Sequence, residues 1–330
     1  MSTLVELGDG LKVAAQGYGA MSLAGQYGPI SDEEGVRTLN AAIDAGVTFL
    51  DTANVYGEGR SESIVGRVLA TRRDEVQLAT KFGIVRDPGP DGKAVRGDRA
   101  YVRRMVEGSL TRLGTDRIDL YYQHRVDESV PIEETVGAMA ELVAEGKVLH
   151  LGLSEATGEE LRRAAAVHPI AAIQSEWSVI SRDVERYVVP AARENGVGFV
   201  PYSPVGRQWL TGLFDPRVLE QGDLRIRFPR LQPETLVANQ PVLDEVVVIA
   251  AEAGVTPAQL VLAWLYDKGR SLGLPVVPIP GTRSPDRVRE NLAAADLELD
   301  PAHAGRLDEL APRIVGERSR SPRWVSGQRE

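Results

Sequence analysis

The segment VTFLDTANVYGEGRSE, residues 47–62, places an acidic residue at the end of a short strand-forming run. Residues 47–50 are β-branched, aromatic or aliphatic types that favour a buried strand, and Asp51 follows them directly. A carboxylate at a buried strand end needs a cation or several hydrogen-bond donors, because burying it unpaired costs several kcal/mol. The segment therefore predicts a positively charged partner for Asp51 on a neighbouring strand.

Similar strand-forming runs recur along the chain and alternate with helical patterns. Eight predicted strands lie at residues 14–17, 47–50, 76–79, 118–122, 148–153, 172–174, 197–200 and 276–279. Predicted helices between them include residues 101–113, 131–144, 159–167 and 184–194, and the capping boxes SDEE (31–34) and TGEE (157–160) mark two helix starts. Repeated strand–helix units build parallel sheets, and eight units favour an α/β fold of the closed (β/α)8 TIM-barrel type over an open doubly wound sheet.

Three segments lie outside this alternation. LVELGDGLKV, residues 4–13, predicts an N-terminal β-hairpin. Residues 205–240 carry many Arg, Pro and polar residues without clear periodicity, so we expect a long loop over the barrel mouth. RSRSPRW, residues 318–324, is expected to be exposed and weakly ordered. Because no linker is evident, residues 1–330 are predicted to form a single domain.

The composition excludes several classes of partner. The 330 residues carry a formal net charge of −9, which disfavours nucleic acid and anionic membranes, and the absence of cysteine excludes disulfides and cysteine-ligated metals. His150, His168 and His303 show no metal-ligand spacing, so no metal site is predicted. The N-terminal region lacks a signal-peptide pattern and no apolar run approaches about 18 residues, so a cytoplasmic protein is expected. No sequence feature indicates an oligomeric state.

Polar residues stand at the ends of consecutive predicted strands. Asp51 ends the second strand, Lys81 the third and His124 the fourth, and the side chain of Tyr56 can fold back toward the same point. Chemistry in barrels of this kind gathers at the carboxyl ends of the strands, so we expect these four side chains to meet there. Lys81 is then the predicted partner of Asp51.

A protonated lysine beside a phenol is expected to change the acidity of the phenol. Coulomb attraction to Lys81 is expected to lower the pKa of Tyr56 from about 10 toward neutrality, which would make the phenol a competent general acid. Asp51 would keep Lys81 protonated, and His124 would hydrogen-bond the same substrate oxygen. Taken singly, Asp51 fits a turn, Lys81 a structural ion pair and His124 a core histidine. Their occurrence together favours a catalytic site.

Five stretches of the sequence together carry a family resemblance: FLDTANVYGEGRSE, LATKFG, GTDRIDLYYQHR, GKVLHLGLSEA and VPIPGTRSPDRVREN. Over almost the whole chain they resemble the aldo-keto reductase superfamily. The spacing of Asp51, Tyr56, Lys81 and His124 matches the catalytic tetrad of that family, and the nearest likeness is to the branch with pyridoxal reductases and plant alkaloid aldehyde reductases. The resemblance implies NADPH-dependent reduction of a small aldehyde or ketone to an alcohol, with Tyr56 as the general acid.

Two alternatives remain open at this point. A nucleotide-sensing regulatory protein of the same superfamily would bind NADPH with little turnover. A Schiff-base lyase on the same barrel would use Lys81 as a nucleophile, which requires a neutral amine. Pairing with Asp51 favours the charged form of Lys81 instead.

The resemblance also implies a set of contacts to NADPH or NADP+. Beyond Asp51, the matching positions are Gly19, Ala20, Met21, Ser154, Glu155, Gln174, Tyr202, Ser203, Pro204, Val205, Gly206, Arg207, Gly281, Thr282, Arg283, Arg287, Glu290 and Asn291. Ser154 and Gln174 match residues that hold the nicotinamide carboxamide, and Tyr202 matches the aromatic residue that stacks on the nicotinamide. The stretch YSPVGRQWLTG, residues 202–212, matches the pyrophosphate loop, and residues 282–291 match the adenosine phosphate and adenine site.

Four positions depart from the family pattern, which puts individual contacts in question. Glu155 stands where many members have Asn, Gln208 replaces a common Gly, Gly281 replaces a Lys of some branches and Trp177 replaces a common Tyr. Substrate selectivity is expected from loops near residues 23–30, 85–97 and 205–240 and from the C-terminal tail.

Overall fold

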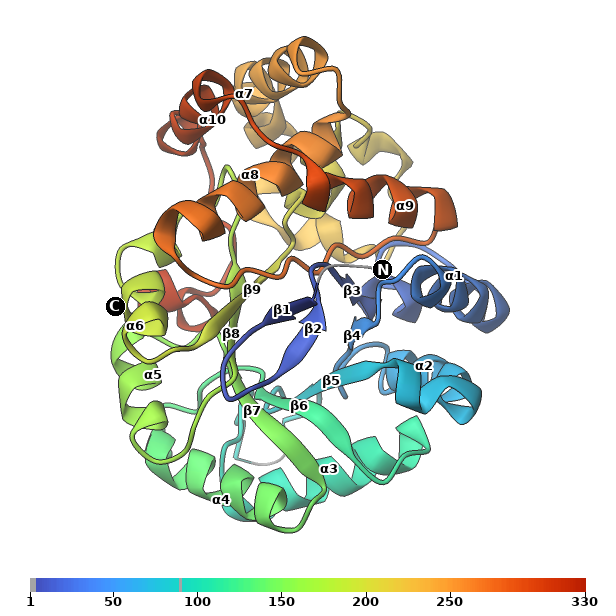
Figure 1. The fold of residues 1–330 in the computed structure, drawn as a ribbon, viewed down its shortest axis with the longest axis vertical. Coiled ribbons are helices and arrows are strands. Elements are labelled where there is room, and N and C mark those ends of the chain that lie inside the picture. Colours follow the sequence, from blue (N-terminus) through green and yellow to red (C-terminus); the bar gives the residue numbers. More distant parts are fainter. Residues whose placement is uncertain (1–3, 89–90) are drawn as a thin grey trace.

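The computed structural model describes residues 4–88 and 91–330 (Figure 1). Its central feature is a parallel sheet with the strand order β3-β4-β5-β6-β7-β8-β9. These strands are β3 Gly17–Gly19, β4 Phe49–Asp51, β5 Gln77–Phe82, β6 Ile118–Gln123, β7 Val148–Ser154, β8 Ala172–Glu176 and β9 Gly198–Tyr202. The sheet curls into a nearly closed barrel, which confirms the predicted α/β barrel.

Helices surround the sheet in the order expected for strand–helix units (Figure 1). They are α1 Asp32–Asp44, α2 Arg60–Arg72, α3 Arg99–Leu113, α4 Ile132–Ala144, α5 Gly158–Ala165, α6 Val188–Glu194, α7 Pro233–Glu252, α8 Pro257–Leu272, α9 Pro285–Ala293 and α10 Pro301–Asp308. Both predicted capping boxes are present, at Ser31 before α1 and at Thr157 before α5. Each satisfies backbone N–H groups that the helix itself leaves unpaired.

The extended segment 276–280 closes the barrel between β9 and β3. The Val277 N–H donates to the Phe199 carbonyl at 2.9 Å, and the Gly17 N–H donates to the Pro278 carbonyl at 3.0 Å. Pro278 and Pro280 have no N–H group, so this segment cannot form a continuous hydrogen-bonded ladder. The eighth predicted strand therefore lies where it was expected, but as an extended connection with two backbone hydrogen bonds to each neighbouring strand.

The N-terminal hairpin covers the end of the barrel at which the strands begin. It consists of β1 Leu4–Glu6 and β2 Lys12–Ala14, and the Gly8 N–H donates to the Ala171 carbonyl at 2.8 Å. Its apolar residues Leu7, Leu11 and Val13 pack into the barrel interior, in one buried cluster with strand residues. The predicted site residues lie at the opposite end of the barrel, where the strands end. The first predicted strand, 14–17, was misplaced, because Ala14 ends β2 and β3 begins at Gly17.

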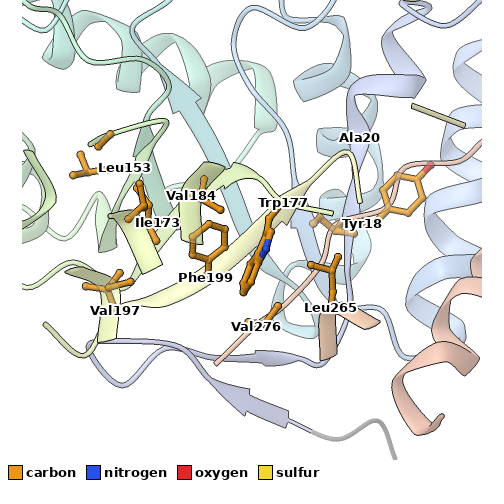
Figure 2. Packing of buried hydrophobic residues seen from close by; sticks show 14 of the residues in the cluster. Tyr18, Ala20, Leu153, Ile173, Trp177, Val184, Val197, Phe199, Leu265 and Val276 are labelled. Atoms are coloured by element: carbon orange, nitrogen blue, oxygen red, sulfur yellow. The ribbon is translucent and has the colours of Figure 1, made fainter. Parts of the chain in front are cut away.

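Large aromatic side chains fill the space between the sheet and the helices. Trp177 is fully buried, with its ring centroid 4.9 Å from that of Phe199 on β9 (Figure 2). Its ring centroid lies 6.4 Å from that of Trp264 on α8. Rings at these separations contribute about 0.5–1.5 kcal/mol per pair beyond the area they bury. This cluster holds β8, β9 and α8 together beneath the barrel mouth.

The prediction of a long loop at residues 205–240 was wrong in part. Short 3-10 helices occupy much of 206–231, and α7 begins at Pro233. Asp215 and Asp223 accept hydrogen bonds from backbone N–H groups two residues on, which stabilises these turns without an apolar period. Within the described residues no single helix is long and apolar enough to cross a membrane; α7 and α8 pass only as a pair bent by 87°.

The C-terminal segment also differs from the prediction of an exposed, weakly ordered tail. Arg318 is only 5% exposed, and Val325 and Ser326 are buried. Arg318 donates to the Glu155 carboxylate at the end of the barrel, which ties the segment to the sheet. The prediction relied on the local sequence, which is rich in Arg and Ser. It therefore missed Glu155, a partner that lies far away in the chain.

Candidate active site

Asp51 and Lys81 form a buried ion pair at the carboxyl ends of β4 and β5. Lys81 Nζ lies 2.5 Å from Asp51 Oδ1 and donates to the Thr52 carbonyl at 2.7 Å, while Gln174 Nε2 donates to Asp51 Oδ2 at 2.8 Å. Lys81 is fully buried and Asp51 is 2% exposed. Burial raises the pKa of the Asp51 carboxyl and lowers the pKa of the Lys81 amine, and each charge is held by the other. The structure confirms Lys81 as the partner of Asp51.

Tyr56 lies in the turn after β4, against both Lys81 and His124. Its ring centroid is 5.1 Å from Lys81 Nζ and 5.7 Å from the His124 ring centroid, in an edge-to-face arrangement. Burial, together with the negative charge of Asp51, raises the pKa of the Tyr56 phenol above its ordinary value of 10.0. The expectation of a lowered pKa was therefore wrong in direction, because burial and the charge of Asp51 outweigh the positive charge of Arg125. Tyr56 keeps its proton at ordinary pH.

His124 follows β6 and is oriented by its backbone. Its N–H donates to the Phe82 carbonyl at 2.7 Å, and its side chain is buried, with Nδ1 unpaired among the described residues. Burial lowers the pKa of the His124 imidazole well below 6.5, and the charge of Arg125 lowers it further. The imidazole is therefore neutral at pH 7, with one ring nitrogen carrying a proton that it can donate.

A cavity of about 950 Å³ opens beside these residues. Asp51, Tyr56 and His124 line it, whereas Lys81 lies behind Asp51, outside the lining. Nearly all predicted cofactor residues also line it: Gly19, Met21, Ser154, Gln174, Tyr202, Ser203, Pro204, Val205, Arg207, Gly281, Thr282, Arg283, Arg287, Glu290 and Asn291. Ala20, Glu155 and Gly206 do not. The predicted substrate loops contribute Tyr27, Val85, Phe228 and Trp324, although residues 89–90 of one loop lie outside the described chain.

The lining of the cavity is rich in arginine. Among the described residues it contains nine arginines and only two carboxylates, those of Asp51 and Glu290. The arginines are Arg86, Arg125, Arg207, Arg225, Arg227, Arg283, Arg287, Arg318 and Arg320. In a protein of net charge −9, such a concentration of guanidinium groups indicates an anionic ligand.

The predicted pyrophosphate loop is held in an unusual backbone conformation. Arg207 and Gln208 have φ values of 54° and 83°, in the left-handed region that non-glycine residues seldom adopt. Arg207 pairs with Glu176 at 2.8 Å, and its guanidinium lies 3.9 Å from the Phe228 ring centroid. Gln208 Oε1 accepts a hydrogen bond from Arg225 at 2.5 Å. Gln208, which departs from the family pattern, thus connects this loop to Arg225.

The predicted adenosine phosphate site lies at the N-terminus of α9. Arg283 and Arg287 are exposed side chains of the lining, and Arg283 Nη1 donates to the Pro29 carbonyl at 2.8 Å. Neither forms an ion pair among the described residues. Helix N-termini attract anions through unpaired N–H groups, so two arginines at such a position suit a phosphate.

Glu155, which was predicted as a cofactor contact, does not line the cavity. It takes a left-handed φ of 52° after β7. Its carboxylate accepts from Arg318 at 2.7 and 3.0 Å, from Ser326 at 2.9 and 3.0 Å and from Tyr202 at 2.6 Å. Burial alone would raise the pKa of Glu155, but Arg318 holds it well below its usual range. Glu155 therefore fastens the C-terminal segment and the Tyr202 ring to the barrel.

The lining residues that were not singled out at the sequence level include Arg125 and Arg318. Arg125 directly follows His124, so the strand-end argument could have included it. Arg318 could not be found in that way, because it is 163 residues from its partner Glu155.

The fold and the site together define an α/β-barrel enzyme with its cavity at the carboxyl ends of the strands. Residues 16–312 match the Aldo/keto reductase family. The chain belongs to that family of oxidoreductases. It is 43% identical to probable aldo-keto reductase 1 of Glycine max over 311 residues, which cover 93% of this chain and 88% of the relative.

Solved structures of the family resemble the whole barrel. A glycerol dehydrogenase from Gluconobacter oxydans is 29% identical with a TM-score of 0.81, over 94% of this chain and 96% of its own. An aldo/keto reductase from Klebsiella pneumoniae, solved in complex with NADP and acetate, is 27% identical with a TM-score of 0.73, over 97% of this chain and 99% of its own.

Proposed function

We propose that this protein reduces an aldehyde or ketone to an alcohol with NADPH, using Tyr56 as the proton donor. The observation that carries the proposal is the Asp51–Lys81 pair beneath Tyr56 and His124, on the wall of an arginine-rich cavity. A regulatory nucleotide sensor does not require a protonated phenol and a neutral imidazole side by side. Carbonyl reduction does, since a proton must reach the carbonyl oxygen.

The residues of the cavity fit NADPH. Arg283 and Arg287 would hold the ribose phosphate at α9, Arg207 would lie beside the pyrophosphate, and Ser154 and Gln174 would orient the nicotinamide against Tyr202. Such a fit is supported by the excess of arginine over carboxylate in the lining. When bound, NADPH supplies the hydride that the carbonyl carbon accepts.

Each residue of the catalytic set has a separate task. Tyr56 and His124 hydrogen-bond the carbonyl oxygen and stabilise the negative charge that develops on it, and Tyr56 then gives up its proton. Lys81 stabilises the resulting phenolate across the 5.1 Å that separates Nζ from the Tyr56 ring centroid. Asp51, held by Lys81 and Gln174, keeps the amine charged and in place.

The test is NADPH absorbance with a panel of aldehydes and ketones. We expect turnover with NADPH for at least part of the panel and a lower kcat/KM with NADH. Tight NADPH binding without oxidation of the cofactor by any carbonyl compound would favour the regulatory alternative. Borohydride trapping of substrate on Lys81 would favour the lyase, but the amine lies outside the cavity lining.

A further inference from the structure

Arg125 is a cation at the catalytic end of the cavity that contacts only neutral groups. Its Nη1 donates to the His124 carbonyl at 2.5 Å and to Ser154 Oγ at 3.2 Å. Its Nε is buried and has no hydrogen-bond partner in the described part of the chain. No described carboxylate lies within 4.0 Å of its guanidinium group, which also lies 5.9 Å from the Trp324 ring centroid.

The other arginines of the lining differ from Arg125. Four are paired with a carboxylate within 3.1 Å: Arg86, Arg207, Arg225 and Arg318. The remaining four are exposed to water: Arg227, Arg283, Arg287 and Arg320. Of the nine described lining arginines, Arg125 alone is both partly buried and without a carboxylate partner.

The carboxylates of Glu155 and Asp51 are already engaged by groups other than Arg125. The Glu155 carboxylate feels the charge of Arg125, but its oxygens already accept from Arg318, Ser326 and Tyr202. The carboxylate of Asp51 is held by Lys81 and Gln174. A partly buried guanidinium group loses part of its hydration, and neutral partners do not fully compensate for that loss. An anion that binds to it can supply the missing stabilisation.

We propose that Arg125 binds a carboxylate group of the substrate, so that the preferred substrates are aldehydes or ketones that also carry a carboxylate. This inference rests on the proposed function. The planar guanidinium fork matches a carboxylate, and Arg125 adjoins His124, which would bind the carbonyl oxygen. The second polar group of the substrate would therefore lie beside the reacting one, flanked by Trp324.

The kinetic test compares 3-formylbenzoate with its neutral methyl ester, both reduced with NADPH. A charge-assisted hydrogen bond corresponds to about a 10- to 100-fold preference, so kcat/KM for the acid should exceed that for the ester by at least about tenfold. In Arg125→Gln this ratio should fall toward one, and Arg125→Lys should restore part of it. Arg323→Gln is the matched control, because it removes an exposed arginine outside the cavity lining and should keep the parental ratio.

Direct binding provides a second measurement that does not depend on turnover. Calorimetry with NADP+ present should show that 3-formylbenzoate binds at least about tenfold more weakly to Arg125→Gln than to the parent.

The possible contrary outcomes separate the inference from the proposed function. Equal kcat/KM values for the acid and the ester in the parent overturn the inference while the proposed function stands. A variant that loses affinity for NADPH, with an unchanged acid-to-ester ratio, also overturns it, because Arg125 then serves the cofactor. If no carbonyl compound is reduced, the proposed function fails, and equal binding of the acid by the parent and Arg125→Gln overturns the inference as well.

Discussion

At the residue scale, Tyr56 owes its chemistry to burial. The phenol keeps its proton because charging it beside Asp51 and away from water is unfavourable. We expect Tyr56→Phe to lower kcat for aldehyde reduction by at least about 10²-fold, because the proton donor is lost while the ring remains. NADPH affinity, measured by fluorescence titration, should change little.

Tyr121→Phe provides the matched control for this experiment. Tyr121 is a fully buried tyrosine whose hydroxyl has no partner among the described residues, but it does not line the cavity. We expect the Tyr121 variant to keep kcat near that of the parent. A Tyr56 variant that reduces aldehydes at the parental rate would remove Tyr56 from its role as the acid.

The Asp51–Lys81 pair has consequences for stability as well as for activity. Lys81→Met leaves a carboxylate that is 2% exposed without its cation, which should lower the free energy of unfolding by about 3–5 kcal/mol. The double variant Asp51→Asn/Lys81→Met removes both charges and should recover much of that loss without recovering turnover. Urea unfolding followed by circular dichroism measures both effects. A single variant as stable as the parent would contradict the importance of this pair for folding.

At the element scale, the C-terminal segment, residues 318–329, acts as a wall of the cavity. Ser319, Arg320, Trp324 and Val325 line it, and Arg318 anchors the segment to Glu155. We expect Arg318→Gln to release the segment, because a buried carboxylate then loses its charged partner. Amide hydrogen exchange should become at least about tenfold faster over these residues than in the parent.

The same Arg318 variant should change substrate selectivity. KM for small aldehydes is expected to rise, since one wall of the cavity is displaced. Arg323→Gln removes an exposed arginine of the same segment and should leave hydrogen exchange unchanged. Unaltered protection in Arg318→Gln would show that other contacts of the segment, such as those of Ser326 with Glu155 and Arg329 with Glu160, hold it in place.

Helix α9 carries the prediction on cofactor choice. Arg283 and Arg287 stand at its N-terminus without carboxylate partners among the described residues, so both are available to the ribose phosphate. Charge-assisted bonds of about 1.5–3 kcal/mol imply about a 10- to 100-fold preference for NADPH per arginine. Arg283→Ala should lose most of this preference through KM. Arg289→Ala, whose guanidinium pairs with Asp286 outside the cavity lining, is the control. Equal use of NADH by the parent would contradict the assignment.

At the scale of the whole molecule, closure of the barrel depends on close backbone approach at β3. A Cβ atom on Gly17 would lie 2.6 Å from Phe49 Cδ1 and 2.8 Å from Ile279 Cγ2. Gly17→Ala should therefore lower the free energy of unfolding by about 1–3 kcal/mol, the usual range for overpacking. Gly137→Ala on α4 meets no atom within 4 Å and should leave stability unchanged or slightly raised. Denaturant unfolding of the two variants measures the difference, and equal stability would show that the barrel relaxes at this joint.

Much of the barrel and of the site could be predicted from the sequence. Strand-forming runs and capping boxes are local patterns, and a parallel barrel brings the ends of consecutive strands to one rim. Asp51, Lys81 and His124 could therefore be grouped by their positions at strand ends, and Tyr56 could be added because it lies five residues beyond Asp51. The assignment of individual cofactor contacts depended on family resemblance rather than on such patterns.

Other properties were decided only by the tertiary structure. Glu155 and Arg318 are 163 residues apart, so neither position carries a local signal of the pairing that places the C-terminal segment over the cavity. The raised pKa of Tyr56 depends on how completely the surrounding chain excludes water, and this cannot be predicted from the spacing of residues in the sequence. For the same reason, the lack of a carboxylate partner for Arg125 appears only when the side chains around it are in place, because pairing and burial depend on contacts between distant segments.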